Sequence, residues 1–254
     1  MFVDTHSHIY SEQFSTDRNE VIDRAVKASV SKIILPNIDS STIKSMLDLA
    51  DSKPQLFIPL IGLHPTSVKE DFRKELEIME YWMNKRKFTG IGEIGIDLYW
   101  DKTFLNEQIE AFRIQIGWAK KMRIPIAIHV RDSFEEVFEV MEQEKEESLT
   151  GVFHSFTGNA EQALQAIDLG FKIGIGGIVT FKNSGLDAVV QHIGLQHILL
   201  ETDSPWLAPA PHRGRRNESA FVSLVAAKIA LLHETSIEEV GRITTQNAQQ
   251  LFGF

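Results

Sequence analysis

Histidines and carboxylates stand at the ends of several short hydrophobic runs in this chain. The first run leads into His6 and His8, and later runs end at Glu93, His129, His154 and Asp203. A charged or polar group at the end of a buried run is costly unless it is paired or bound. Imidazoles and carboxylates are ligands for zinc and similar divalent ions. The pattern therefore predicts one metal site, built from several strand ends, and points to a metal-dependent hydrolase.

The number of candidate ligands suggests two ions. His6 and His8 are two residues apart, so on a strand both side chains would point to the same face and could hold one ion together. Four histidines and two carboxylates exceed the needs of one tetrahedral ion, but they suit two ions that share a bridging carboxylate. The alternative is that one or two of the six are hydrogen-bonded core residues.

Strand-like and helix-like segments alternate along the whole chain. Strands are expected near 2–6, 32–36, 56–62, 88–94, 125–130, 150–154, 171–176 and 197–202. Helical periodicity is clear over 103–122 and 132–142. Asp132 with Glu135 resembles a capping box, Gly170 is placed to end a helix, and Ser236 with Glu239 is expected to start a last helix toward Leu251.

Roughly eight strand–helix units in about 250 residues predict a single (β/α)8 TIM barrel over residues 1–254. In such a barrel the metal site lies at the C-terminal ends of the strands. A doubly wound open sheet is the alternative, because it shows the same alternation. The run Gly174–Gly177 lacks the spacing of a phosphate-binding loop. Segment 203–217 is rich in Pro, His and Arg and is expected to form a substrate loop.

Composition narrows the functional class. The net charge of -9 gives no general attraction for nucleic acid or anionic membranes, so a polyanionic substrate would need local help. The absence of cysteine excludes disulfides and thiolate chemistry. No stretch approaches the roughly 18 apolar residues of a membrane span. The expectation is a cytoplasmic protein, monomeric and without an obligate protein partner.

Six motifs together carry a family resemblance. They are Asp4–His8, Gly62–Pro65, Gly92–Asp97, Ile128–Arg131, Phe153–Phe156 and Leu200–Pro205. In this order they resemble the TatD-type metal-dependent deoxyribonuclease family, one of the amidohydrolase-like metal-dependent hydrolases. The resemblance covers nearly the whole chain, to Arg213–Glu218. It implies a TIM barrel with a divalent, often two-metal, site. Departures are minor: Ser7 and Ser155 stand where many relatives carry small residues including Cys.

The resemblance also implies a ligand assignment. His6, His8 and Asp203 would hold the first ion, His129 and His154 the second, and Glu93 would bridge the two. The set leaves the metal open among Zn²⁺, Mn²⁺, Co²⁺, Ni²⁺ and Mg²⁺, although Mg²⁺ usually prefers fewer imidazoles. Two ions could activate a water for attack on a phosphodiester, and Asp203 could take its proton while also acting as a ligand.

Four further residues are candidates for substrate contact. Arg131 lies two residues beyond His129, where its guanidinium would suit a phosphate or would pair with Asp132. His64 could contact substrate, donate to a metal ligand or cap the turn before Pro65. Arg213 and Arg216 belong to a basic cluster after the last strand, which could bind substrate or fasten the loop to the barrel.

Tyr99 and Trp100 follow the fourth strand and could offer a face for base stacking or pack in the core. Asp4 and Glu201 lie on the same faces as ligand residues and are expected to fix an imidazole tautomer.

Three functions fit these observations. The first, implied by the resemblance, is a deoxyribonuclease, an exonuclease on single-stranded DNA. The second is a two-metal hydrolase of a small ester, lactone or amide, because barrels of this kind host many reactions. The third is a metal-binding scaffold for a partner protein. A steep fall of DNA binding with rising salt would distinguish the first function from the second.

Overall fold

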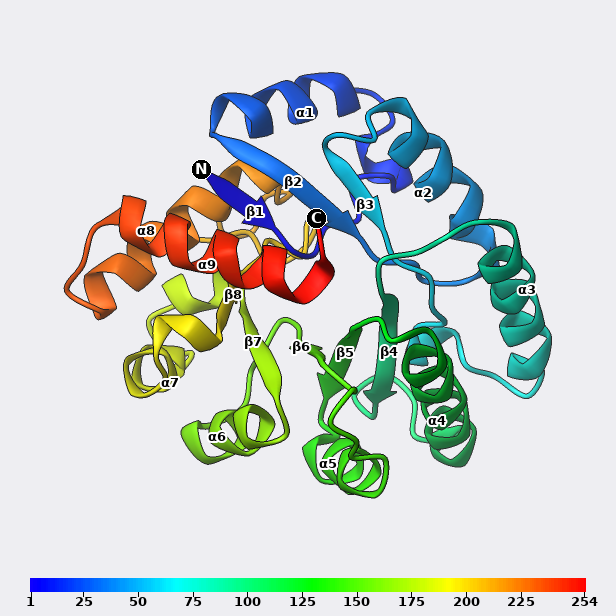
Figure 1. The fold of residues 1–254 in the computed structure, drawn as a ribbon. Helices are drawn as coiled ribbons and strands as arrows, with labels where there is room; N and C mark the ends of the chain where they lie inside the picture. Colours follow the sequence, from blue (N-terminus) through cyan, green and yellow to red (C-terminus); the bar gives the residue numbers. More distant parts are fainter.

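The computed structural model describes residues 1–254 as eight parallel strands that alternate with helices around a barrel (Figure 1). The strands are β1 (Phe2–Asp4), β2 (Val30–Leu35), β3 (Phe57–Pro59), β4 (Ile91–Asp97), β5 (Ile126–Arg131), β6 (Gly151–Phe153), β7 (Phe171–Ile175) and β8 (Ile198–Leu200). The α-helices are α1 (Arg18–Lys27), α2 (Ser40–Ser52), α3 (Phe72–Lys85), α4 (Leu105–Met122), α5 (Phe134–Gln143), α6 (Ala160–Asp168), α7 (Leu186–His192), α8 (Val222–Leu232) and α9 (Ile237–Phe252).

The strands pair in sequence order and the ring closes. One parallel sheet runs β1-β2-β3 and the other runs β4-β5-β6-β7-β8. A parallel bridge between Ile61 and Ile91 joins the two sheets beyond β3. On the other side, Thr5 N–H donates to the Leu200 carbonyl at 2.9 Å and Ser7 bridges to Ser204. The predicted TIM barrel is confirmed.

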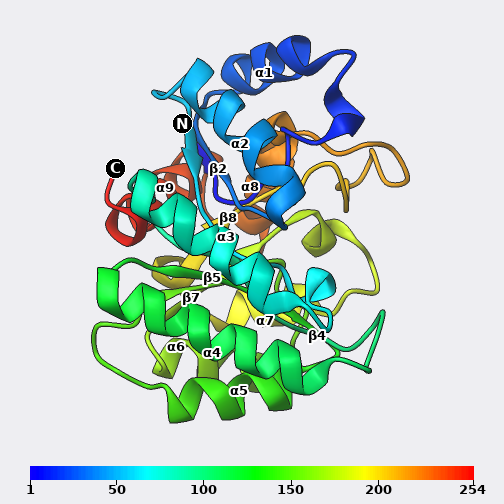
Figure 2. The same cartoon turned by 90° about the vertical axis from the view of Figure 1, so that its right-hand side faces the viewer.

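The last helix closes the N-terminal end of the barrel. Ala248 and Phe252 of α9 pack against a small cluster of apolar side chains from the strands, among them Val3, Ile34 and Leu199. Figure 2 shows α9 at one end of the barrel and the loop after β8, in orange, toward the other. The apolar plug leaves the opposite end, where the strands terminate, free to carry polar groups.

The predicted strands are all present, but β4 is displaced. It starts at Ile91 and extends to Asp97, so Glu93 lies inside the strand instead of at its end. Ser236 caps α9 by accepting from Glu239 N–H, and Gly170 ends the segment after α6 with φ +89°, as predicted. The capping box at Asp132 was wrong. The N-cap of α5 is Ser133, whose hydroxyl donates to the Ile96 carbonyl.

No single helix is both long and apolar enough to cross a membrane. The segments Ser219–Leu232 and Ile237–Phe252 meet the length and composition only as a pair, which is bent by 110°.

Candidate metal centre

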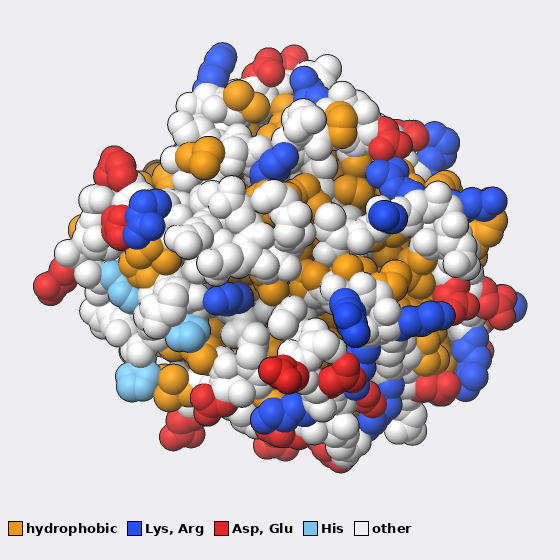
Figure 3. All heavy atoms as spheres, viewed as in Figure 1, with side chains coloured by type: hydrophobic (Ala, Val, Ile, Leu, Met, Phe, Trp, Pro, Cys, Tyr) orange, Lys and Arg blue, Asp and Glu red, His pale blue; other side chains and the backbone are white.

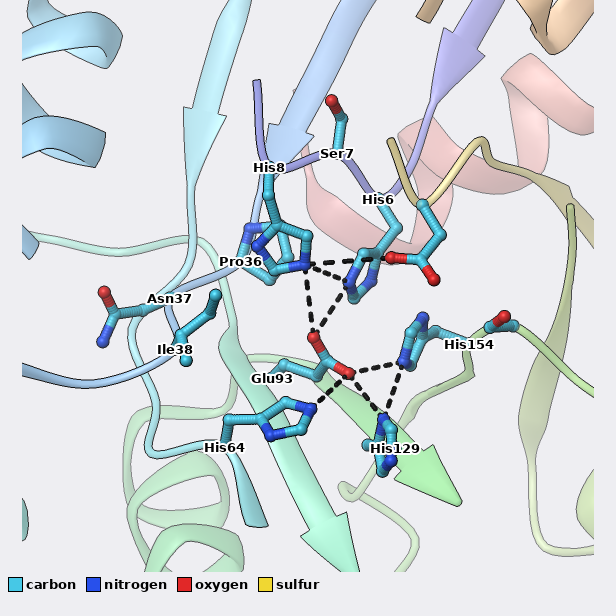
Figure 4. A network of polar contacts seen from close by, with 12 residues as sticks. His6, Ser7, His8, Pro36, Asn37, Ile38, His64, Glu93, His129 and His154 are labelled. Atoms are coloured by element: carbon cyan, nitrogen blue, oxygen red, sulfur yellow. Dashed lines mark hydrogen bonds and ion pairs between the residues drawn. The ribbon is translucent and has the colours of Figure 1, made fainter. Parts of the chain in front are cut away.

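Glu93 lies at the middle of a group of histidines where the strands end (Figure 4). The pairing register between β4 and β5 shifts between Ile91 and Ile94, so Glu93 sits in a bulged stretch of strand. Asn37, after β2, fixes this stretch: its N–H donates to the Gly92 carbonyl at 3.0 Å, and its carbonyl accepts from Glu93 N–H at 3.1 Å. Bulges of this kind redirect a side chain.

The two oxygens of the Glu93 carboxylate face different imidazoles. Oε2 lies 3.0 Å from His6 Nε2 and 3.5 Å from His8 Nε2. Oε1 lies 2.8 Å from His129 Nδ1 and 2.6 Å from His154 Nε2. The carboxylate thus separates the histidines into two pairs, each directed at one oxygen. This arrangement allows Glu93 to bridge two cations.

The hydrogen on His8 can be located from its neighbours. The Tyr10 hydroxyl donates to the Pro36 carbonyl at 2.7 Å, so it must accept the hydrogen of His8 Nδ1 at 2.8 Å. Burial raises the pKa of Tyr10 well above its usual value, which keeps that hydrogen on the hydroxyl. His8 Nε2 therefore presents a lone pair to the cluster.

Asp97 fixes the ring of His129 in the same way. Its Oδ2 accepts from His129 Nε2 at 2.8 Å, which leaves Nδ1 facing Glu93. The other oxygen of Asp97 accepts from the backbone N–H groups of Tyr99 and Trp100. Although burial opposes it, the hydrogen bond to His129 leaves the pKa of Asp97 below its usual value. A carboxylate on the far nitrogen of a metal-binding histidine is a recurrent arrangement.

His64 directs a hydrogen, and not a lone pair, at Glu93. Its Nδ1 accepts from Thr66 N–H at 3.1 Å and caps the turn that begins at Pro65. A neutral ring then carries its hydrogen on Nε2, which donates to Glu93 Oε1 at 3.1 Å. His64 therefore combines two of the predicted roles, the turn cap and the donor to a ligand, and it offers no lone pair to a metal.

His6 and His154 depend on the cluster for their polar contacts. Their rings stack with centroids 3.8 Å apart, and the Nδ1 atom of each is buried without a hydrogen-bond partner. Burial lowers the pKa of both, so the rings are neutral and able to bind a metal. Glu201 approaches His154 Nδ1 only to 3.9 Å, too far for a hydrogen bond, and accepts instead from Ser155 N–H.

Asp203 lies beside the first pair of histidines. Its Oδ1 is 3.9 Å from His8 Nε2. One possible metal-ligand atom from each of His6, His8 and Asp203 lies within 4.8 Å of the other two. Burial, followed by repulsion from Glu93, raises the pKa of Asp203 well above its usual value. The ionised form of Asp203 therefore requires a cation nearby.

The donor set fits divalent cations. The lone pair of His129 Nδ1 and the Glu93 carboxylate face each other, which requires a proton or a metal ion between them. Burial lowers the pKa of His129, but hydrogen bonds to Asp97 and Glu93 outweigh it and raise the pKa to about 9. Burial also opposes ionisation of Glu93, yet the surrounding imidazoles hold its pKa well below its usual value. A metal ion can replace the shared proton.

A pocket of about 680 Å³ opens over this cluster. Its wall includes five of the six predicted ligands, together with His64 and Arg131; His6 is buried and does not line it. Arg131 is exposed and turns its guanidinium over the Tyr99 ring, 4.3 Å from the centroid. It does not pair with Asp132. The pocket thus joins the candidate ligands to one free guanidinium.

The other two predicted substrate arginines do not line the pocket. Arg216 pairs with Asp17 at 2.5 Å, donates to the Gln13 carbonyl at 2.6 Å and lies over the Phe14 ring. These contacts support the other predicted role of Arg216, fastening the loop to the barrel, and its contact with substrate stays a prediction. Arg213 lies over the Phe181 ring, 4.5 Å from the centroid, and also stands outside the pocket wall.

Two supporting residues were missed in the sequence, and Asp4, like Glu201, was misassigned. Asp97 and Tyr10 direct His129 and His8, yet neither was given a role. Asp97 could have been found, because it is a second acidic residue four positions beyond Glu93 in the same apolar run. Asp4 touches no imidazole ring; it accepts from the hydroxyl of Thr202 at 2.7 Å and from Thr202 N–H at 2.9 Å. It ties β1 to the segment after β8.

The chain is similar to known proteins over nearly its whole length. A family model described as TatD related DNase matches residues 3–253. YabD of Bacillus subtilis, an uncharacterized metal-dependent hydrolase, is 39% identical over 253 residues, which cover 99% of each chain. YcfH of Escherichia coli K12, also an uncharacterized metal-dependent hydrolase, is 31% identical over 255 residues, covering 98% of this chain and 95% of YcfH.

A solved structure shows the same fold. The crystal structure of YjjV, a TatD homologue from Escherichia coli K12, superposes with a TM-score of 0.93 at 28% identity, covering 100% of this chain and 98% of YjjV. The family model spans almost every residue, and the relatives match from end to end. The chain therefore belongs to the TatD-related DNase family of metal-dependent hydrolases.

Proposed function

We propose that this protein is a two-metal phosphodiesterase that shortens single-stranded DNA from one end. The observation that carries the proposal is the division of the imidazoles between the two oxygens of Glu93. His6, His8 and Asp203 would hold the first ion, His129 and His154 the second, and Glu93 would bridge them. Divalent ions bound there would supply an activated water and a clamp on the phosphodiester oxygens.

The remaining side chains have roles that follow from their hydrogen bonds. Asp203 is a ligand with lone pairs to spare, so it can accept the proton of the attacking water. His64 carries a hydrogen on Nε2, which it donates to Glu93 Oε1, and it can donate this hydrogen to a phosphate oxygen instead. Arg131 presents a planar guanidinium suited to a phosphate. Together they position a phosphodiester over the histidine cluster.

The test is degradation of end-labelled DNA. Protein stripped with EDTA receives Mg²⁺, Mn²⁺, Zn²⁺, Co²⁺ or Ni²⁺ and is incubated with single strands that carry the label at the 3′ or the 5′ end. Metal-dependent shortening from one end is expected, with no activity in Asp203→Asn and only partial loss of bound metal. Full activity of Asp203→Asn would exclude the role of Asp203. No cleavage with any metal, with ions confirmed bound, would contradict the nuclease.

Two observations favour a second function, hydrolysis of a small ester, lactone or amide. The pocket volume of about 680 Å³ lies in the range of small-molecule sites, and the chain carries a net charge of -9. A panel of such substrates, assayed with the same metal-loaded protein, addresses this possibility. DNA binding that falls steeply with salt supports the nuclease, because phosphate contacts release counterions. Cytoplasmic location and a monomeric state stay predictions of the sequence.

A further inference from the structure

Two large aromatic side chains stand exposed at the wall of the pocket. The Tyr99 side chain is 53% exposed and that of Trp100 is 71% exposed. Both belong to the connection between β4 and α4, and both line the pocket over the histidine cluster. The sequence left open whether they pack in the core, and their exposure excludes that alternative. Aromatic surface at the mouth of a polar pocket is typical of a ligand contact.

The aromatic pair is held in a fixed relation to the candidate metal ligands. Asp97 Oδ1 accepts from Tyr99 N–H at 3.0 Å and from Trp100 N–H at 3.2 Å. The other oxygen of the same carboxylate holds His129 Nε2 at 2.8 Å. One side chain therefore fixes both the imidazole and the turn that carries the rings. A group bound on the rings would have a defined distance from the reacting phosphate.

Arg131 completes the wall next to the rings. Its guanidinium carbon lies 4.3 Å from the Tyr99 ring centroid and 6.0 Å from that of Trp100. The guanidinium makes no ion pair within 4.0 Å, so its N–H groups are free for an anion. Arg131 lies closer to Tyr99, and Trp100 is the more exposed of the two rings, so the indole offers the larger open surface.

We propose that Trp100, Tyr99 and Arg131 form a subsite for one nucleotide of the substrate. The base stacks on the Trp100 indole, and Arg131 binds the phosphate of the same nucleotide. Tyr99 packs against both of these side chains. The proposal rests on the proposed nuclease function and names the feature of DNA, the unpaired base, that the site recognises. Base–aromatic stacking tolerates every base, so the subsite selects for an unstacked base and not for a sequence.

The subsite also gives a reason for a preference for single strands. A base in a duplex is stacked and paired, and bringing it onto Trp100 would first require breaking that stacking and pairing. A terminal or single-stranded nucleotide avoids most of this cost. The preference would then originate in Trp100 and not in the metal ligands.

The experiment compares two oligomers of equal length, an oligothymidylate and a strand with the same backbone but no bases, both labelled with fluorescein. Binding is measured by fluorescence anisotropy in Mn²⁺ with the Asp203→Asn variant, because this substitution is expected to prevent cleavage. We expect thymidylate to bind roughly tenfold more tightly, because stacking of one base contributes about 1–3 kcal/mol. Trp100→Ala should bring the ratio of the two affinities close to one by weakening the binding of oligothymidylate alone. Trp100→Phe should retain most of the difference.

Two further variants separate the contributions. Arg131→Ala should weaken both oligomers to a similar extent, because both carry phosphates. Tyr81→Ala removes an aromatic side chain that is 56% exposed on α3, away from the pocket, and should change neither affinity.

A ratio near one before any change at Trp100, or equal weakening of both oligomers by Trp100→Ala, would overturn the subsite. Cleavage of the oligothymidylate by the metal-loaded wild-type protein is measured alongside. Failure of that cleavage counts against the proposed nuclease, whereas the binding ratio decides the subsite.

Discussion

Tyr10 shows how a side chain outside the metal cluster decides what a histidine inside it can bind. Its hydroxyl donates to the Pro36 carbonyl and accepts from His8 Nδ1, so the lone pair of His8 lies on Nε2. Asp97 holds the hydrogen of His129 on Nε2, so its lone pair on Nδ1 faces Glu93, whereas Thr66 holds the hydrogen of His64 on the nitrogen that faces Glu93. The hydrogen bonds from neighbouring residues thus make His8 and His129 able to bind a metal and make His64 a hydrogen-bond donor.

Tyr10→Phe tests this arrangement at the scale of one atom. Without the hydroxyl, His8 Nδ1 and the Pro36 carbonyl lose their partners in the interior, and the ring loses its fixed tautomer. We expect metal affinity to fall by about 10–100-fold, as is usual when such a support is removed. Isothermal titration with Mn²⁺ or Zn²⁺ measures the change. Tyr81→Phe, which removes an exposed hydroxyl on α3, is the control. Unchanged affinity in Tyr10→Phe would show that Tyr10 does not orient His8.

Among the elements, β7 contributes to the site through Gly174, which has no side chain. A Cβ atom on Gly174 would collide with the carboxylate of Glu201 and approach the His154 Cα to 3.0 Å. The missing side chain therefore makes room for Glu201, which is fully buried and lies 3.9 Å from Nδ1 of the candidate ligand His154. Burial, together with repulsion from Asp203, raises the pKa of Glu201 well above its usual value. Close approach of backbone and side chain is a common reason for glycine within a strand.

Gly174→Ala should therefore disturb stability and site together. We expect a loss of about 1–3 kcal/mol in the free energy of unfolding, as for other overpacked interiors, together with weaker metal binding because His154 shifts. Urea denaturation and metal titration provide the two readouts. Gly117→Ala is the matched control, since a Cβ there meets no atom within 4 Å and lies in α4. It should be neutral or stabilising by up to about 1 kcal/mol. Equal behaviour of the two variants would exclude the proposed collision.

At the scale of the whole molecule, charge is dispersed outside the site. The net charge is -9, and Figure 3 shows acidic and basic side chains interspersed over the face seen in Figure 1. With Arg213 and Arg216 engaged elsewhere, attraction of a phosphodiester depends on Arg131 and on the cations that the cluster would hold. Binding of DNA should therefore depend strongly on bound metal.

The cluster also couples metal binding to pH. The pKa of His129 is raised to about 9, so below that pH a metal ion must displace a proton. We expect metal affinity to rise between pH 7 and pH 9, by up to about tenfold per unit, and to level off above. Titration calorimetry in buffers of different protonation enthalpy counts the released protons.

Asp97→Asn is the control for this titration, because it removes the carboxylate that raises the pKa and should move the rise to lower pH. Affinity that does not vary with pH would contradict the shared proton. In the metal-free protein the same proton stabilises the fold. That contribution is complete below the ordinary value of 6.5 and is lost as the pH rises through about 9.

The sequence by itself determined the alternation of strands and helices and the residues that follow the strands, because strand and helix patterns depend on neighbours in the chain. The same alternation also fits an open sheet, so closure into a barrel was decided by the contacts between the first and last strands. The six predicted ligands converge because parallel strands of one barrel end on the same side. Five of them line the pocket, and His6 is buried beside them in the histidine cluster.

Only the tertiary structure decided how these residues are arranged and which hydrogens they carry. The bulge that directs Glu93 depends on Asn37 of another strand–helix connection, and the tautomer of His129 depends on Asp97, 32 positions earlier. The contacts of Arg216 with the segment near Asp17 join parts of the chain that are 199 residues apart. Such contacts form only when the barrel closes, and local periodicity carries no information about hydrogen bonds between distant segments.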